Sequence, residues 1–209
     1  MNKKGLFVVL EGDDGSGTTT QLQQTANLLR HNFGFSNILT TIEPYKYGEV
    51  KSTLRSRNLS PEEQLELFVG DRILHGKEIL IPNLEKGVAV VSDRYFISTF
   101  VYQGVQGIPR DRIMDANYHS FIPVPDITFI LNVSHRVATK RLSNRHALDK
   151  FERDDEIREK RLQMYQTFVE YAERFPSFFG KVVNINGNAI IEDVSDEIRV
   201  NLKKFLESK

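Results

Sequence analysis

The chain has 209 residues, 40% of them hydrophobic and 27% charged, a composition that is ordinary for a soluble globular protein with a sizeable core. Its 28 Lys and Arg balance its 28 Asp and Glu, so no overall charge points to nucleic acid or an acidic membrane as a partner. Cysteine is absent, which excludes disulfides and thiolate sites, and no apolar run is long enough for a signal peptide or a membrane helix, so we expect a cytoplasmic protein.

Strand-like runs alternate with helical patterns, which predicts an α/β fold with a parallel sheet and helices on both faces. We expect, in chain order, a strand at 7–10, a helix at 21–31, a strand at 37–42, helices at 48–57 and 61–85, strands at 88–91 and 129–133, helices at 134–142 and 156–175, a strand at 182–185 and a helix at 194–206. The helix at 61–85 begins at a strong cap, Ser60-Pro61, and can bend near Pro82. No repeat or linker divides the chain, so residues 1–209 are interpreted as a single domain.

A glycine-rich turn, residues 11–20, joins the first expected strand to the first expected helix. This order is the context of a phosphate-binding P-loop, in which glycines let backbone N–H groups turn toward phosphate oxygens at a helix N-terminus. The lysine position of the usual motif holds Thr18, whereas Thr19 occupies the position of the hydroxyl that binds Mg²⁺. Taken alone, the loop also allows a plain tight connection. The candidate phosphate-binding residues are Gly12, Asp13, Asp14, Gly15, Ser16, Gly17, Thr18, Thr19 and Thr20.

Asp93 and Arg94 directly follow the apolar strand at 88–91. The carboxyl end of a strand in such a sheet is where ligands bind, an acid there can hold Mg²⁺, and an arginine can clamp phosphate. An exposed ion pair is the alternative interpretation. Tyr102 and Gln103, a little further along, can pack on and hydrogen-bond a base.

Phe68 and Arg72 are four residues apart in an expected helix, so they share one face. A ring beside a guanidinium suits a flat heterocycle, although a half-buried phenylalanine with a solvated arginine is the commoner case. The cationic segment from Arg141 to Glu152 is a candidate lid over phosphates, and a solvated charge run is its alternative.

In this order and spacing, the motifs resemble those of the thymidylate kinase family. The resemblance runs from about Leu6 to Tyr165. Its elements are the P-loop at 11–20, Glu43-Pro44, Phe68-x-x-Asp71-Arg72, Asp93-Arg94-Tyr95 with Ser98 and Tyr102-Gln103-Gly104, Pro125-Asp126, and Asp149-x-Phe151-Glu152.

The resemblance implies a P-loop NTPase-like kinase that uses ATP and Mg²⁺ to phosphorylate dTMP, with a lid at about 142–153 and a homodimeric assembly. It places Thr19 and Asp93 at the metal and Arg94 at the phosphates. It places thymine against Phe68 and Arg72, with Tyr102 excluding a 2′ hydroxyl. The residues implied to bind dTMP are Asp14, Glu43, Phe68, Arg72, Arg94, Ser98, Tyr102 and Gln103, and those implied in catalysis are Asp93, Arg94, Arg145 and Lys150.

Three departures from the family pattern concern charge. Thr18 replaces the P-loop lysine, Ile42 replaces the arginine that many relatives carry before Glu-Pro, and Tyr45-Lys46-Tyr47 replaces the glycine-rich stretch that follows Glu-Pro. Lys46, Arg145 and Lys150 are the candidates to supply the missing charge. Two alternatives therefore stay open: a kinase for another nucleotide or nucleoside, and a nucleotide-binding protein with weak or no catalysis.

Overall fold

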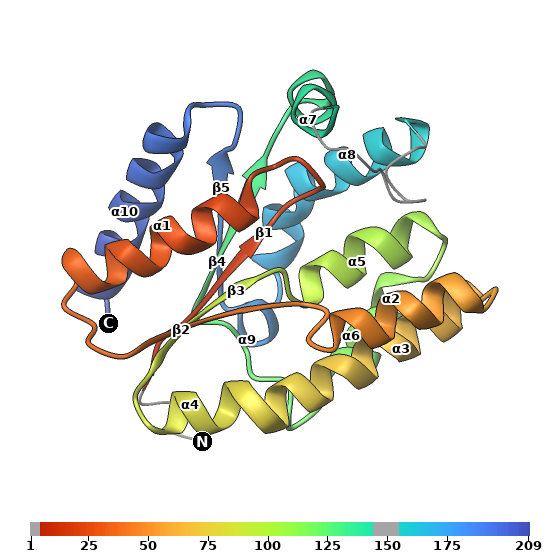
Figure 1. Cartoon of the computed structure of the whole chain (residues 1–209), viewed down its shortest axis with the longest axis horizontal. Coiled ribbons are helices and arrows are strands. Elements are labelled where there is room, and N and C mark those ends of the chain that lie inside the picture. Colours follow the sequence, from red (N-terminus) through yellow and green to blue (C-terminus); the bar gives the residue numbers. More distant parts are fainter. Residues whose placement is uncertain (1–4, 144–154) are drawn as a thin grey trace.

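The computed structural model describes residues 5–143 and 155–209. Five strands in these ranges form one parallel sheet in the order β2-β3-β1-β4-β5, which confirms the predicted fold class (Figure 1). The strands are β1 (Phe7–Glu11), β2 (Ile38–Ile42), β3 (Ala89–Asp93), β4 (Ile127–Asn132) and β5 (Lys181–Asn186). Every residue of β1 and β3 is buried, as expected for central parallel strands that are covered on both faces.

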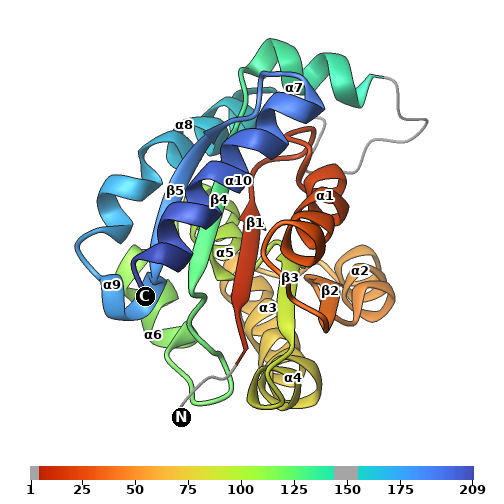
Figure 2. The ribbon, with the colours of Figure 1, turned by 90° about the vertical axis from the view of Figure 1, so that its left-hand side faces the viewer.

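Helices pack on both faces of the sheet (Figure 2). One face carries α1 (Thr18–His31) and α10 (Ile191–Glu207), which contact each other and bury their apolar sides on the sheet. The larger layer on the other face includes α3, α5 and α8. The remaining described helices and their neighbours are α2 (Tyr47–Ser56), α3 (Pro61–His75), the π-helical segment η1 (Gly76–Leu80), α4 (Ile81–Glu85), α5 (Phe96–Val105), α6 (Arg110–Asn117), α7 (His135–Leu142), α8 (Asp155–Ala172) and α9 (Pro176–Phe179).

The structure differs from the predicted elements in three places. Helices α5, α6 and α9 were not predicted; α5 is buried over most of its surface, so its sequence lacks the apolar–polar alternation of a surface helix. Helix α1 starts at Thr18, earlier than expected, because the P-loop glycine Gly17 is its N-cap. The predicted helix at 61–85 is continuous but contains the π-helical segment before Pro82.

This topology brings two segments that are distant in sequence to one edge of the sheet. Leu10 of β1 is paired with Asp93 of β3, so the P-loop after β1 lies beside the residues that follow β3. The edge at the carboxyl ends of the strands is therefore the place to look for a site. No helix within the described ranges is long and apolar enough to cross a membrane.

Candidate active site

The P-loop connects β1 directly to α1. Gly15 and Gly17 have φ values of 86° and 99°, a left-handed conformation that costs glycine little, and a Cβ on Gly15 would lie 2.9 Å from the Ala138 carbonyl oxygen. Thr18 is buried in the first turn of α1. A tight turn of this kind at a helix N-terminus is the backbone arrangement that binds phosphate. The loop conformation thus survives the replacement of its lysine.

Thr19 and Asp93 form the contact between the P-loop and β3. The Thr19 hydroxyl donates to Asp93 Oδ2 at 2.7 Å. Asp93 Oδ1 is buried and has no hydrogen-bond partner in the described part of the chain. Because Mg²⁺ at nucleotide sites takes one or two protein oxygens together with phosphate oxygens, a hydroxyl beside an unpartnered carboxylate oxygen fits this ion.

Arg94 lies at the centre of the same edge. Its Nη2 donates to Asp14 Oδ1 at 2.5 Å and its Nη1 to the Tyr102 hydroxyl at 3.1 Å. Burial raises the pKa of Tyr102 well above its ordinary value, so this side chain stays a neutral phenol. The Tyr102 hydroxyl lies 3.0 Å from Asp14 Oδ2 and 3.1 Å from Asp13 Oδ1. Because a phenol has one proton, it donates a hydrogen bond to only one of these carboxylates at a time.

Arg161 is a site residue that the sequence did not reveal. Its Nε donates to Asp13 Oδ1 at 2.7 Å, its guanidinium lies 4.8 Å from the centre of the Tyr102 ring, and both ion-pair partners are 0% exposed. This buried ion pair links α8 to the P-loop, next to the ring of Tyr102. No local motif marks Arg161, because its partner lies 148 positions earlier in the chain.

Glu11, at the end of β1, links the P-loop to α5 and α8. Its carboxylate accepts hydrogen bonds from the Tyr95 backbone N–H at 2.9 Å, the Ser98 backbone N–H at 3.1 Å and the Ser98 hydroxyl at 2.6 Å. The Tyr165 hydroxyl lies 3.4 Å from the same carboxylate. Burial raises the pKa of Glu11 to about 7, against the opposing effect of these donors and of the Arg94 charge.

The raised pKa of Glu11 predicts a pH-dependent stability. The pKa of Glu11 is about 7 in the folded protein and 4.5 for an unperturbed glutamate, the value we take for the unfolded chain. Between pH 4.5 and 7 the folded state therefore binds more protons than the unfolded state, and the unfolding free energy falls as the pH rises through this range. We expect the unfolding free energy of wild type relative to Glu11→Gln to fall by roughly 2–3 kcal/mol between about pH 5 and pH 8. Urea unfolding of both proteins across this range measures the difference. Parallel pH profiles would contradict the assignment.

A second buried network surrounds Arg72 of α3. Arg72 Nε donates to Glu43 Oε2 at 2.8 Å and Nη1 to Asn117 Oδ1 at 2.6 Å, while His75 Nδ1 lies 3.0 Å from Glu43 Oε1. Phe68, one turn earlier, is half-buried, so its ring is partly accessible. Arg72 is therefore held rigidly by two partners, and Glu43 serves to orient it.

The other residues predicted from the sequence fall into two groups. Gln103 of α5 is buried, and the hydroxyl of Ser98 is engaged by Glu11. Arg145 and Lys150, and most of the predicted lid at about 142–153, lie outside the described residues.

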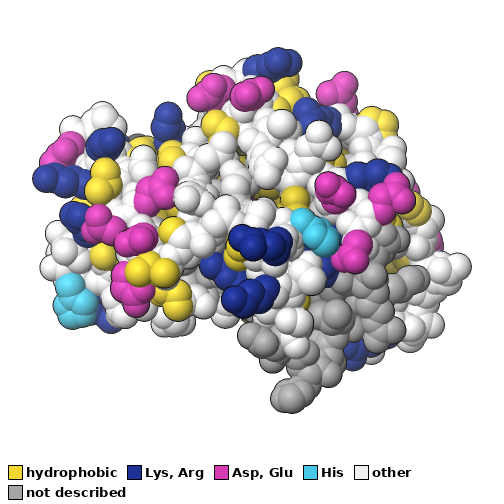
Figure 3. Space-filling model, turned by 90° about the horizontal axis from the view of Figure 1, so that it is seen from above, with side chains coloured by type: hydrophobic (Ala, Val, Ile, Leu, Met, Phe, Trp, Pro, Cys, Tyr) yellow, Lys and Arg dark blue, Asp and Glu magenta, His cyan; other side chains and the backbone are white. Residues whose placement is uncertain are grey.

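Arg141 of α7 brings a positive charge to the P-loop. Its Nη1 donates to the carbonyl oxygens of Gly15 and Ser16, at 3.2 Å each, and its Nη2 to Ala189 at 3.4 Å. Lys46, by contrast, lies 3.4 Å from Glu78 and over the ring of Tyr45. Viewed onto the carboxyl ends of the strands, Lys and Arg side chains gather near the middle of this face (Figure 3).

Comparisons with known proteins agree with this geometry. The family profile described as thymidylate kinase matches residues 10–198. A probable thymidylate kinase of Archaeoglobus fulgidus is 34% identical, over 98% of this chain and 98% of the relative. The thymidylate kinase of Caldicellulosiruptor saccharolyticus is 34% identical over 99% and 100% of the two chains, and a probable thymidylate kinase of Methanococcus aeolicus is 36% identical over 100% and 98%.

Proposed function

The chain belongs to the thymidylate kinase family, and on that premise we propose that it transfers the γ-phosphoryl group of ATP to dTMP, giving ADP and dTDP. The observation that carries the proposal is the junction of β1 and β3. There the P-loop, the Thr19–Asp93 contact and the Arg94–Asp14 ion pair lie together. Phosphoryl transfer requires positioning and neutralisation of phosphate charge more than any covalent group, and this junction offers both.

On the donor side, we assign the backbone of residues 12–20 to the phosphates of ATP. Thr19 and Asp93 would hold Mg²⁺, and the ion when bound neutralises charge on the phosphates. Arg94 stabilises the charge that develops during transfer, and Asp14 together with Tyr102 orients its guanidinium.

On the acceptor side, we assign thymine to Phe68 and Arg72, with Gln103 lining the base. Tyr102 packs against the sugar and leaves no room for a 2′ hydroxyl. We assign indirect roles to Glu43 and Ser98. The Glu43 carboxylate accepts a hydrogen bond from Arg72 and orients it, and the Ser98 hydroxyl donates to Glu11.

Because Thr18 is uncharged, another residue has to supply the positive charge that the P-loop lysine usually places at the phosphates. Arg141 contributes from α7, since it already contacts two carbonyl groups of the loop. We keep Arg145 and Lys150 as the proposed catalytic cations of a lid at about 142–153. With positive charge from Arg141 and from the lid, the protein can transfer a phosphoryl group although Thr18 replaces the P-loop lysine.

A coupled ADP-release assay with dTMP, dUMP, dCMP and thymidine tests the function. We expect ATP-dependent ADP release that is greatest with dTMP and requires Mg²⁺. Faster release with another acceptor would assign the protein to that nucleotide or nucleoside. Nucleotide binding without any ADP release would make it a binding protein, which is the alternative that Thr18 favours.

Phe68→Ala is expected to weaken dTMP binding by about 1–3 kcal/mol, the scale of base–aromatic stacking. Calorimetry with dTMP measures the loss. Phe33→Ala is the matched control, because Phe33 is also half-buried but packs in the core on the opposite face of the sheet. Equal dTMP affinity in wild type and Phe68→Ala would show that the base does not stack on Phe68.

The assembly, the location and the domain count remain predictions. We propose a cytoplasmic homodimer in which residues 1–209 form a single kinase domain. Sedimentation velocity tests the assembly, since a monomer at micromolar concentration would contradict it.

A further inference from the structure

His75 of α3 is fully buried, and both nitrogens of its ring have partners. Its Nδ1 lies 3.0 Å from Glu43 Oε1, and its Nε2 lies 2.8 Å from the Thr41 hydroxyl oxygen. The ring also stacks on Tyr45, with the ring centres 5.1 Å apart and an angle of 10° between the planes. A rotation of the imidazole would break these contacts, so the ring is fixed in one orientation.

The partners of His75 determine where its ring carries a proton. Glu43 forms an ion pair with Arg72, so its carboxylate is ionised and can only accept, and Nδ1 of His75 is the donor. In a neutral ring Nε2 accepts from the Thr41 hydroxyl, and in a charged ring Nε2 donates to that oxygen. In both charge states, Nδ1 therefore donates to the carboxylate of Glu43.

The Glu43 carboxylate connects His75 to Arg72. While Oε1 accepts from the imidazole, Oε2 accepts from Arg72 Nε at 2.8 Å. Arg72 Nη1 donates to Asn117 Oδ1 at 2.6 Å, and in the described part of the chain no hydrogen bond engages Nη2. The two bonds fix the plane of the guanidinium and leave Nη2 to donate to a bound base. Because a carboxylate is rigid and planar, a donor that holds Oε1 also fixes the position of Oε2.

The backbone next to His75 is held as well. Gly76, at the end of α3, packs so closely on the segment before β4 that a Cβ would lie 1.6 Å from the Phe121 carbonyl oxygen. From Gly76 to Leu80 the helix is π-helical, a conformation that is frequent at functional sites. The end of α3 is thus fixed against the segment that leads to β4, and the imidazole is fixed with it.

We propose that His75 is a positioning residue for base recognition, which holds Arg72 through Glu43 so that thymine is preferred over cytosine. The inference rests on the proposed function, since it concerns the base that we place at Phe68 and Arg72. Thymine presents an acceptor oxygen at C4, whereas cytosine presents an amino donor there. A fixed guanidinium donates to the thymine oxygen and meets the cytosine amino group donor to donor, while a guanidinium that can turn away discriminates less between the two bases.

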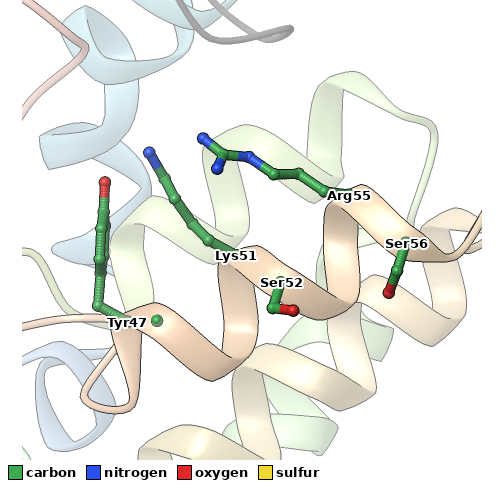
Figure 4. Close-up of a pocket in the computed structure, with 6 residues that line it drawn as sticks. Tyr47, Lys51, Ser52, Arg55 and Ser56 are labelled. Atoms are coloured by element: carbon green, nitrogen blue, oxygen red, sulfur yellow. The ribbon is translucent and has the colours of Figure 1, made fainter.

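A second contact of α3 holds the start of α2 and provides a control for effects on that helix. The two oxygens of Asp71 accept from the backbone N–H groups of Tyr45 and Lys46, at 2.5 Å and 2.7 Å. Helix α2 begins at the next residue, and its side chains from Tyr47 to Ser56 line a cavity of about 520 Å³ (Figure 4). The substitution Asp71→Asn weakens the attachment of α2 but leaves the contact between the imidazole and the carboxylate in place.

The ratio of kcat/KM for dTMP to that for dCMP, measured with ATP in the coupled ADP-release assay, tests the proposal on His75→Asn and His75→Gln. The amide nitrogen of asparagine is bonded to Cγ, as Nδ1 is in histidine, so His75→Asn can still donate to Glu43 and should keep most of the preference for dTMP. The amide nitrogen of glutamine is one bond further from the backbone, as Nε2 is. We therefore expect His75→Gln to lower the ratio by about 10- to 100-fold, the scale of a hydrogen bond to a charged group. The loss should appear in the KM for dTMP, with the KM for ATP unchanged.

Two further variants separate positioning from general damage to the fold. Asp71→Asn should keep the wild-type ratio, whatever its effect on turnover. Leu84→Ala opens a cavity in the core near Gly5, at the opposite ends of the strands, so it should lower stability and also keep the ratio. Urea unfolding gives the stability of every variant.

Several results would overturn the proposal. An unchanged ratio in His75→Gln would exclude His75 from base selection. An equal loss in both His75 variants, the same loss in Leu84→Ala, or failure of either His75 variant to fold would mean that the residue only supports the fold. Equal use of dTMP and dCMP by wild type would refute the selectivity while the kinase activity stands. If wild type releases no ADP with any acceptor, the proposed function itself fails, and the inference fails with it.

Discussion

Arg94→Ala is expected to lower kcat by about 10³- to 10⁵-fold, the range that a well-placed arginine contributes to phosphoryl transfer. The guanidinium is held by Asp14 and Tyr102 at the junction of the P-loop and β3, where we propose that the phosphoryl group is transferred. The variant should stay folded, because the side chains of Arg94 and Asp14 are 19% and 23% exposed and water can solvate the carboxylate that remains. The coupled ADP-release assay gives kcat, and urea unfolding gives the stability.

Two further variants separate the guanidinium from the backbone of Arg94. Arg94 has a φ of 70°, which is uncommon for any residue other than glycine, so Arg94→Gly should relieve backbone strain and be as inactive as Arg94→Ala. Arg30→Ala, at the exposed end of α1, removes an arginine remote from the site and should leave kcat unchanged. Turnover of Arg94→Ala within about tenfold of wild type would place the transfer site elsewhere.

The strained backbone of Arg94 is itself held by neighbouring strands. Its N–H donates to the Leu10 carbonyl oxygen at 2.8 Å, and the Ser92 hydroxyl donates to its carbonyl oxygen at 2.8 Å. A strained residue persists only where its surroundings fix it, so this geometry supports a functional role for Arg94.

The sequence predicted those parts of the molecule whose signal is local. Strands β1 and β3 are short apolar runs, and the glycines of the P-loop mark a turn without reference to the rest of the chain. The Asp93–Arg94 motif was placed correctly at a strand end, because the strand that precedes it is unambiguous. The all-parallel sheet followed from the alternation of strands and helices.

What the sequence did not predict depends on distant partners. Helix α5 has the continuous apolar character of a buried segment, and only its position between α3, α6 and α8 explains it. The hydrogen bonds that hold Arg72 were not predicted, because its partners Glu43 and Asn117 are 29 and 45 positions away in the chain. Glu11 was recognised only as part of a motif, because its raised pKa arises from burial beneath α5 and α8.

Breaking the buried pair of Asp13 and Arg161 is expected to cost more stability than any other single substitution at the site. Arg161→Met leaves the Asp13 carboxylate fully buried without its ion-pair partner, and Asp13→Leu does the same to Arg161, so each should cost about 3–5 kcal/mol of unfolding free energy. Asp196 and Arg199 of α10 provide the matched control, since they form an ion pair of the same types at 2.7 Å but are 62% and 36% exposed. Arg199→Met should cost less than about 1 kcal/mol.

The double variant Asp13→Leu/Arg161→Met decides whether the pair stabilises the fold or only avoids an unpaired charge. Two buried charges pay a desolvation penalty that offsets most of their attraction, so replacing both by apolar side chains of similar size should bring stability back to within about 2 kcal/mol of wild type. Urea unfolding of the four proteins gives the coupling free energy directly. If the two single losses simply add in the double variant, the charges do not interact, and the contact between α8 and the P-loop must depend on other groups, such as Tyr102.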